Sequence, residues 1–232
     1  MTNIPERLIE MIKLVANALG PDMLNETAFV GGCTTGLLLT DSLTKETVRY
    51  TEDVDLIIDV IGYPKWVQLQ ENLRKKGFKE SMSKGPICRM LLNELEVDFM
   101  PIDESILGFS NIWYRQALES ARPHILDENL TINLLTPPLF VATKLEAYQG
   151  RGNDDPIGSR DIEDIIILFD GREEIVNEIT NSDNKLKDYI ASHISSLLED
   201  SLLEYPIQSQ ARNSPGRDSI IYNRLAQVSN FK

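Results

Sequence analysis

Three carboxylates stand at the beginning of an apolar segment in VRYTEDVDLIIDV, residues 48–60. We expect residues 54–60 to form a buried β-strand, because they are rich in Val, Ile and Leu. Glu52, Asp53 and Asp55 occupy its start, where an unpaired buried charge is costly. These side chains must therefore stay in water or surround a cation.

The alternation of side chains along a strand decides which of these acids can act together. It predicts Asp53, Asp55 and Asp59 on one face and Val54 and Leu56 on the core face. Carboxylates two residues apart on a strand lie about 6 to 7 Å from each other, a gap that a divalent cation can bridge. Mg²⁺ prefers such oxygen ligands and retains positions for water and phosphates. The alternative is that these are solvated acids at a strand end.

A second acidic segment, ELEVDFMP at residues 94–101, repeats the pattern. Glu94, Glu96 and Asp98 alternate with apolar residues. If this strand lies beside residues 54–60, Asp98 can face Asp53 and Asp55. Three carboxylates on adjacent strands can hold two metal ions about 3.5 to 4 Å apart, the arrangement used for in-line phosphoryl transfer.

A glycine turn precedes both strands in AFVGGCTTGLLL, residues 28–39. We expect a strand near residues 26–31, then Gly31-Gly32, then a helix near residues 33–42. Glycines allow close approach of a phosphate, and a helix N-terminus offers free N–H groups. A tight strand-to-helix turn would explain the two glycines equally well.

Taken together, VGGC, RYTEDVDL and VDFMP resemble the polymerase-β-like nucleotidyltransferase superfamily, with its Gly-Gly-Ser/Thr turn, Asp-x-Asp pair and later single Asp. The arrangement R-x-T-x-D-x-D, with LFVATKLEAYQGRG and SRDIEDII, is similar to the AbiEii-like branch. Members of that branch are toxins of bacterial toxin–antitoxin and phage-defence systems. The resemblance covers about residues 26–170.

The resemblance implies a role for each matching residue. The implied catalytic residues and ligands of two Mg²⁺ ions, which Mn²⁺ could replace, are Asp53, Asp55 and Asp98. The implied nucleotide contacts are Gly31, Gly32, Cys33, Thr34, Arg49, Lys144 and Arg151. Asp161 and Asp164 would support the site by positioning Lys144, Arg160 or a substrate group; a capping Asp and a solvated helix face are the alternative.

Position 33 departs from the pattern of the superfamily, which has Ser or Thr there. This chain has Cys33, and a thiol is a weak hydrogen-bond donor. Thr34, Thr35 or backbone N–H groups would have to replace the missing hydroxyl.

The implied activity is transfer of NMP from an NTP such as ATP to an acceptor hydroxyl, with release of pyrophosphate. The acceptor could be a tRNA 3′ end, a protein side chain or a small molecule such as an antibiotic. A net charge of −13 argues against RNA. A basic run over residues 74–89 argues for it, unless this run is only a solvated helix end and hairpin. A cognate antitoxin is implied by the resemblance alone, and a degenerate NTP- or partner-binding regulatory module is the alternative to an enzyme.

Composition narrows the class of protein. The chain has 232 residues, 42% hydrophobic and 25% charged, which is typical of globular domains. No apolar run approaches the ~20 residues of a membrane span, and residues 1–20 have the spacing of an amphipathic helix rather than a signal peptide. We therefore expect a cytoplasmic protein without membrane contact.

Two cysteines and two histidines argue against a disulfide framework, a zinc site and His-based catalysis.

The expected fold class is α+β (mixed α/β). Residues 1–122 would form a polymerase-β-like nucleotidyltransferase core, a mixed β-sheet flanked by helices. Residues 123–232 would form a mostly helical C-terminal region with a flexible tail after about residue 205. We expect ICRMLL and LEVDFM to form a hairpin around Asn93-Glu94, and IQSQARNSPGRDS to form a loop. The expected helices are residues 4–19, 33–42 and 64–77, NIWYRQALESA, TPPLFVATKLEAYQG, GSRDIEDIIILFDG and residues 183–203.

Overall fold

A computed structural model describes residues 3–80, 86–151, 154–212 and 214–231. The chain forms two compact units. Unit 1 comprises the chain up to Thr34 together with Arg49–Thr136, and unit 2 comprises Thr35–Val48 together with the chain from Pro137 onward. The chain passes between the units after Thr34, after Val48 and after Thr136, and the division after residue 122 stays a prediction from the sequence.

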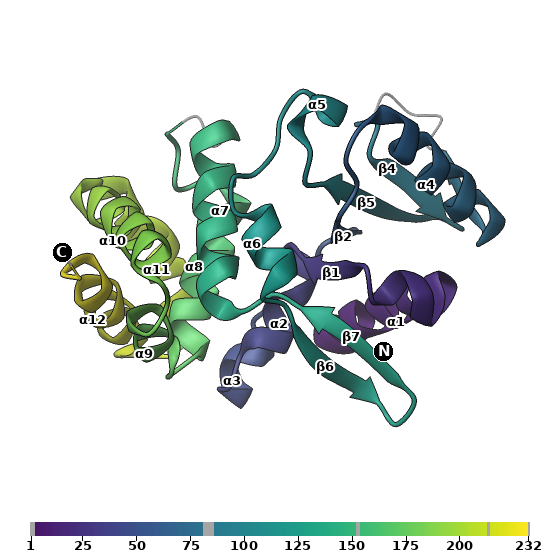
Figure 1. The fold of residues 1–232 in the computed structure, drawn as a ribbon. Coiled ribbons are helices and arrows are strands. Elements are labelled where there is room, and N and C mark those ends of the chain that lie inside the picture. The colour runs from purple at the N-terminus through teal and green to yellow at the C-terminus, as the bar shows by residue number, and fades with distance from the viewer. Residues whose placement is uncertain (1–2, 81–85, 152–153, 213, 232) are drawn as a thin grey trace. The chain divides into compact units, whose positions relative to one another are not determined.

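Unit 1 contains a seven-stranded sheet in the order β3-β4-β5-β2-β1-β7-β6 (Figure 1). The pairs β2–β5 and β1–β7 are parallel and the others antiparallel, so the predicted mixed sheet is confirmed. The strands are β1 (Thr27–Val30), β2 (Asp53–Ile58), β3 (Phe78–Glu80), β4 (Arg89–Leu92), β5 (Leu95–Pro101), β6 (Arg122–Asp127) and β7 (Leu130–Leu134).

Helices flank this sheet. They are α1 (Ile4–Leu24), the 3₁₀ turn η1 (Gly32–Thr34), α4 (Tyr63–Lys75), α5 (Glu104–Leu107) and α6 (Tyr114–Glu119). A capping box between Asn3 and Glu6 begins α1, and its apolar face is buried. The helix kinks at Gly20, which has a φ of 70° and precedes Pro21. Lys76 Nζ donates a hydrogen bond to the Leu19 carbonyl at this kink.

The predicted hairpin around Asn93-Glu94 is confirmed. Strands β4 and β5 pair with Leu92 opposite Leu95, which leaves a two-residue turn. Asn93 takes a positive φ of 57°, a conformation that Asn tolerates better than most residues. Because the turn is so short, it also fixes every other pair in the hairpin, including Arg89 opposite Asp98.

The hairpin β6–β7 was not predicted, since the sequence beyond the core was expected to be mostly helical. In β7 the alternate residues Leu130, Ile132 and Leu134 are buried, which is the period of a strand. Strand β6 forms an edge of the sheet and is largely exposed, and Pro123 lies within it, as edge strands allow.

Unit 2 is mostly helical, as expected. Its elements are α2 (Thr35–Leu38), α3 (Ser42–Lys45), α7 (Pro137–Arg151), α8 (Arg160–Gly171), α9 (Ile175–Thr180), α10 (Asn184–Glu199), η2 (Ser201–Leu203), α11 (Glu204–Ala211) and α12 (Arg217–Ser229). The helix predicted over residues 33–42 is confirmed only for Thr35–Leu38 (α2), which follows η1; residues 39–41 are not helical, and α3 begins at Ser42. The N–H groups of Thr40 and Asp41 instead bind the Gly171 carbonyl at the end of α8.

The loop predicted at IQSQARNSPGRDS is confirmed only between the two helices, at residue 212 and residues 214–216, and helices α11 and α12 occupy most of the stretch expected to be a flexible tail. Ile207, Ile221, Leu225 and Val228 are buried in unit 2. Arg217 at the start of α12 binds the carboxylates of Asp170 and Asp41. Buried apolar residues, the ion pairs of Arg217 with two aspartates, and hydrogen bonds from Gln210 and Arg224 to α8 thus hold this segment. None of the described helices combines the length and apolar character that a membrane span requires.

Candidate metal centre

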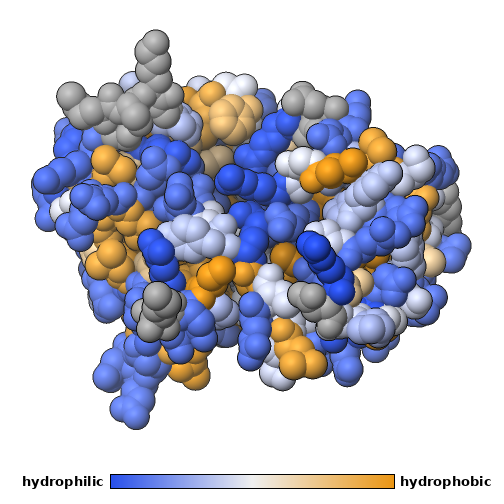
Figure 2. Space-filling model, turned by 180° about the vertical axis from the view of Figure 1, so that it is seen from behind, coloured by the Kyte–Doolittle hydropathy of each residue, from blue (hydrophilic) through white to orange (hydrophobic). Residues whose placement is uncertain are grey.

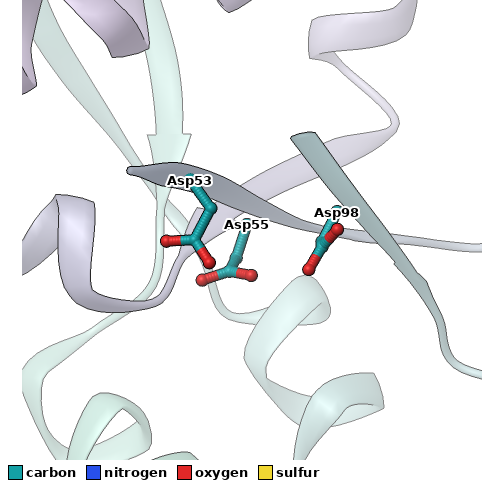
Figure 3. Close-up of side chains that lie close together, drawn as sticks. All are labelled: Asp53, Asp55 and Asp98. Atoms are coloured by element: carbon teal, nitrogen blue, oxygen red, sulfur yellow. The ribbon is translucent and has the colours of Figure 1, made fainter. Parts of the chain in front are cut away.

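The parallel strands β2 and β5 bring three aspartates together. Asp55 pairs with Asp98 in the register, and Asp53 lies two residues earlier on the same strand as Asp55. The side chains of all three point to the same side of the sheet (Figure 3). One carboxylate oxygen from each lies within 4.8 Å of the others. The predicted convergence of the three acids is confirmed.

This oxygen spacing suits a small divalent cation. Two ligands of one Mg²⁺ ion, each at about 2.1 Å, lie at most about 4.2 Å apart. The 4.8 Å limit of the triad is only slightly wider, so small side-chain rotations would close it. Asp98 is 7% exposed, whereas Asp53 and Asp55 are half-buried. The cluster is therefore sheltered but open to solvent from one side.

Neighbouring groups hold two of the aspartates in place. The Thr51 hydroxyl, itself buried, donates a short hydrogen bond to Asp53 Oδ1. Gly31 packs directly on Asp55: a Cβ added at Gly31 would lie 1.9 Å from Asp55 Oδ2. Gly31 also has a φ of 75°, which favours glycine. The first glycine of the turn is therefore explained by the turn itself and by the Asp55 carboxylate.

Arg89 on β4 is part of the same cluster. Its Nε and Nη2 each donate at 2.8 Å to one oxygen of Asp98. Its Nη1 donates to Glu96, and its Nη2 lies 3.7 Å from Asp53 Oδ2. These contacts raise the pKa of Arg89, chiefly through the hydrogen bonds to Asp98. One guanidinium thus contacts three carboxylates.

Sequence reasoning placed Arg89 in a basic run and Glu96 in an acidic pattern, without assigning either to the site. The length of the hairpin turn could have predicted that Arg89 lies opposite Asp98. A two-residue turn at Asn93-Glu94 puts residues 92 and 95 opposite each other, and counting three residues outward pairs Arg89 with Asp98.

The thiol of Cys88 lies beside this cluster. Burial raises the pKa of Cys88 to about 12, and the negative charges of Asp98 and Asp55 add to the increase. The thiol therefore stays protonated at neutral pH, and the centre offers carboxylate oxygens rather than a thiolate. Such a donor set suits a hard cation.

A groove of about 530 Å³ in unit 1 is lined in part by Glu96, which accepts a hydrogen bond from Arg89, but by none of the three aspartates. Glu52 and Glu96 flank the triad in sequence and line the groove with Glu10 and Glu94. Arg7 stacks on the Tyr50 ring, 4.5 Å from its centroid. The rim is thus mainly acidic.

The remaining residues of the turn direct their side chains at the main chain. Cys33 is buried, and its thiol donates to the Val30 carbonyl. The Thr34 hydroxyl donates to the Gly31 carbonyl at 2.9 Å. Gly32 is buried. Only the short elements η1 and α2 follow, so the long helix whose N-terminus was expected to face phosphate does not form.

In unit 2, the aspartates of α8 bind cations of α7. Lys144 Nζ lies 3.1 Å from Asp161 and 2.7 Å from Asp164, and all three residues are buried. Arg151, whose side chain is 72% exposed, donates two hydrogen bonds of 3.1 Å to Asp161. Burial by itself would raise the pKa of Asp161, but Lys144 and Arg151 outweigh it and lower the pKa. The two acids thus position Lys144, one of the roles considered from the sequence.

Arg49 and Asp59 are two further residues that the sequence singled out. Arg49, before the Thr-x-Asp-x-Asp motif, is half-buried, and its Nη1 approaches the Tyr50 carbonyl at 3.5 Å. Asp59 was expected on the face of Asp53 and Asp55, but it follows the last residue of β2 and is exposed. Asp59 is not part of the described triad.

Comparison with known proteins assigns this chain to no family. No family model matches the chain, and no curated protein matches it. What the molecule shows is a mixed α/β fold with an acidic triad that could hold a metal ion.

Proposed function

We propose that this protein is a Mg²⁺-dependent nucleotidyltransferase of the polymerase-β-like kind, with features of the AbiEii-like branch. The observation that carries the proposal is the convergence of Asp53, Asp55 and Asp98 from two adjacent parallel strands. The order of a glycine turn, an Asp-x-Asp strand and a later single Asp supports it.

In the proposed reaction, an acceptor hydroxyl forms a bond to the α-phosphorus of an NTP. The bond between the α-phosphorus and the bridging oxygen breaks, and pyrophosphate leaves. Asp53, Asp55 and Asp98 would hold Mg²⁺, and Asp98 would help to take up the hydroxyl proton. Bound Mg²⁺ would supply charge neutralisation for the triphosphate. The chain itself positions the reactants and forms no covalent intermediate.

Nucleotide contacts are proposed from the resemblance. Because Cys33 and Thr34 direct their side chains at backbone carbonyls, we assign phosphate contact to the main chain of the turn at Gly31 and Gly32. Arg49, Lys144 and Arg151 are the proposed cationic contacts. Lys144 is a buried partner of two aspartates, so Arg151 is the more accessible of the two cations in unit 2.

The acceptor is proposed to be a protein side chain or a small molecule ahead of tRNA. Within the described part of the basic run, Arg74 pairs with Glu80, Lys76 binds a carbonyl of α1, and Arg89 binds the acidic cluster, whereas Lys75 and Lys79 are exposed. Lys84 lies outside the described residues. The acidic groove would repel a phosphate backbone. Roles as a toxin and as the partner of an antitoxin rest on the resemblance alone.

A transfer assay tests the proposal. Wild type, Asp55→Asn and Asp59→Asn would each receive α-labelled NTPs and Mg²⁺, with total tRNA or lysate protein as acceptor. Asp59→Asn is the matched control, because Asp59 is exposed just beyond the same strand. We expect label on an acceptor with wild type and Asp59→Asn and none with Asp55→Asn. Equal labelling by all three proteins would refute the assignment of the triad.

A regulatory module that binds NTP without transferring it is a second candidate. The bidentate hold of Arg89 on Asp98 favours it, because both oxygens of one proposed metal ligand already accept hydrogen bonds. Wild type that binds Mg²⁺-NTP but labels no acceptor, and releases no pyrophosphate, would favour this second candidate.

A further inference from the structure

We propose that Arg89 acts as a built-in counter-cation that weakens binding of free divalent ions, so that a metal ion enters the site together with a triphosphate. This inference rests on the metal centre proposed above. It assigns a role in metal loading to a residue outside the triad.

The contacts of Arg89 place a fixed positive charge against two of the three proposed metal ligands. Its Nη2 lies 2.8 Å from Asp98 Oδ2 and 3.7 Å from Asp53 Oδ2. An Arg guanidinium stays protonated at any physiological pH. A divalent ion on the same carboxylates would therefore lie within a few ångströms of a like charge, and this repulsion weakens its binding.

The cross-strand register keeps Arg89 in this position. Arg89 lies directly opposite Asp98 on the paired strand β4. The fork geometry of guanidinium matches both oxygens of Asp98, so the pair is specific as well as close. The side chain of Arg89 is 21% exposed, and the low solvent access limits screening of its charge.

Glu96 gives Arg89 a second anchor. Arg89 Nη1 donates to Glu96, which faces Asp53 across β2 and β5 but is not one of the triad. Arg89 can therefore loosen its hold on Asp98 and remain bound to Glu96. A triphosphate would add negative charge near the site, offset the repulsion between Arg89 and the metal, and give the guanidinium another acceptor.

Binding of Mn²⁺ alone, without nucleotide, tests this inference. Titrations followed by electron paramagnetic resonance would compare wild type with Arg89→Met, Arg89→Gln and Arg89→Lys. We expect at least about tenfold tighter Mn²⁺ binding in the two uncharged variants, since a nearby like charge is removed. Arg89→Lys retains the charge and should stay close to wild type. With a non-hydrolysable triphosphate present, the difference between wild type and Arg89→Met should shrink.

Controls separate this inference from the proposed function. Arg74→Gln removes an exposed ion pair of the same unit and should leave Mn²⁺ binding unchanged. Thermal unfolding with and without Mn²⁺ would run in parallel, so a destabilised variant still reports binding as a rise in its midpoint. If wild type binds Mn²⁺ and Arg89→Met binds equally or more weakly, the counter-cation role is overturned while the metal centre stands. If no variant binds Mn²⁺, both proposals fail.

Discussion

Each unit of this protein contains a group of neighbouring carboxylates that bind cationic side chains. The two groups differ in the number of carboxylates for each cation. In unit 1, Asp53, Asp98 and Glu96 share contacts with a single guanidinium, that of Arg89. In unit 2, Asp161 and Asp164 bind the ammonium of Lys144, and Arg151 adds a second cation to Asp161.

The two groups also differ in burial and in the number of acids. Asp164 is fully buried, whereas Asp53 and Asp55 are half-buried. Within the described residues, only the group in unit 1 brings three acids close enough to hold a metal ion. Adjacent aspartates by themselves therefore do not identify a metal centre. The number and placement of the cations among them distinguish a metal centre from a structural ion cluster.

The largest expected effect is on the stability of unit 2. Lys144→Met removes the ammonium that compensates two buried aspartates, and should lower the free energy of unfolding by about 3 to 5 kcal/mol. Chemical denaturation measures this change. Arg151→Gln is the control, because its exposed ion pair should contribute less than about 1 kcal/mol. Similar losses in the two variants would contradict the structural role assigned to Lys144.

A smaller effect, confined to unit 1, is expected for Gly31→Ala. The new Cβ would overlap the Asp55 carboxylate and displace it, lowering Mn²⁺ affinity by about 10- to 100-fold. Calorimetric titration measures the affinity. Gly108→Ala is a matched control, since Gly108 has a positive φ of 79° but nothing within 4 Å of its added Cβ. A loss of affinity in the control as well would mean that backbone strain, rather than contact with Asp55, is responsible.

Asp55→Asn should alter stability still less. The change removes one of three clustered negative charges, which relieves repulsion, so the free energy of unfolding should stay within about 1 kcal/mol of wild type. Circular dichroism during urea unfolding measures it. A loss as large as that of Lys144→Met would show that the triad, like the group in unit 2, is mainly structural.

The smallest effect concerns pH. The folded pKa of Asp161 lies below its unfolded value of about 3.9, so its ionised form stabilises unit 2 above that pH and the contribution is lost as the pH falls further. The difference in unfolding free energy between wild type and Asp161→Asn should therefore be constant from pH 7 to about pH 5 and shrink below about pH 4. A difference that grows on acidification would contradict this assignment.

One face of the molecule carries both hydrophilic and hydrophobic side chains (Figure 2). In the view of Figure 2, hydrophilic residues cover most of the face, and hydrophobic residues lie in small groups. The groove lined by Glu52, Glu94 and Glu96 adds a group of acidic residues to the surface of unit 1.

The parts of the site that depend on local periodicity could be predicted from the amino-acid sequence. Alternating acidic and apolar residues placed Asp53 and Asp55 on one face of a strand, and a two-residue turn predicted the hairpin that carries Asp98. Terminal Pro and Gly residues predicted α7, and apolar residues at helical spacing predicted α8, which carries Asp161 and Asp164. These features follow from side-chain direction within one element, which neighbouring residues fix.

Which charged side chains contact each other depends on the packing of elements that are distant in sequence. The sheet order that makes β2 and β5 neighbours, the position of Arg89 against Asp98, and the burial of Lys144 all join residues distant in sequence. The helices α11 and α12 likewise depend on packing and on the contact of Arg217 with Asp170, because the polar segment IQSQARNSPGRDS, which contributes to both, was predicted to be a loop. Periodicity is a local property, whereas burial and ion pairing depend on contacts between elements, and these contacts distinguish the candidate metal centre from a structural ion cluster.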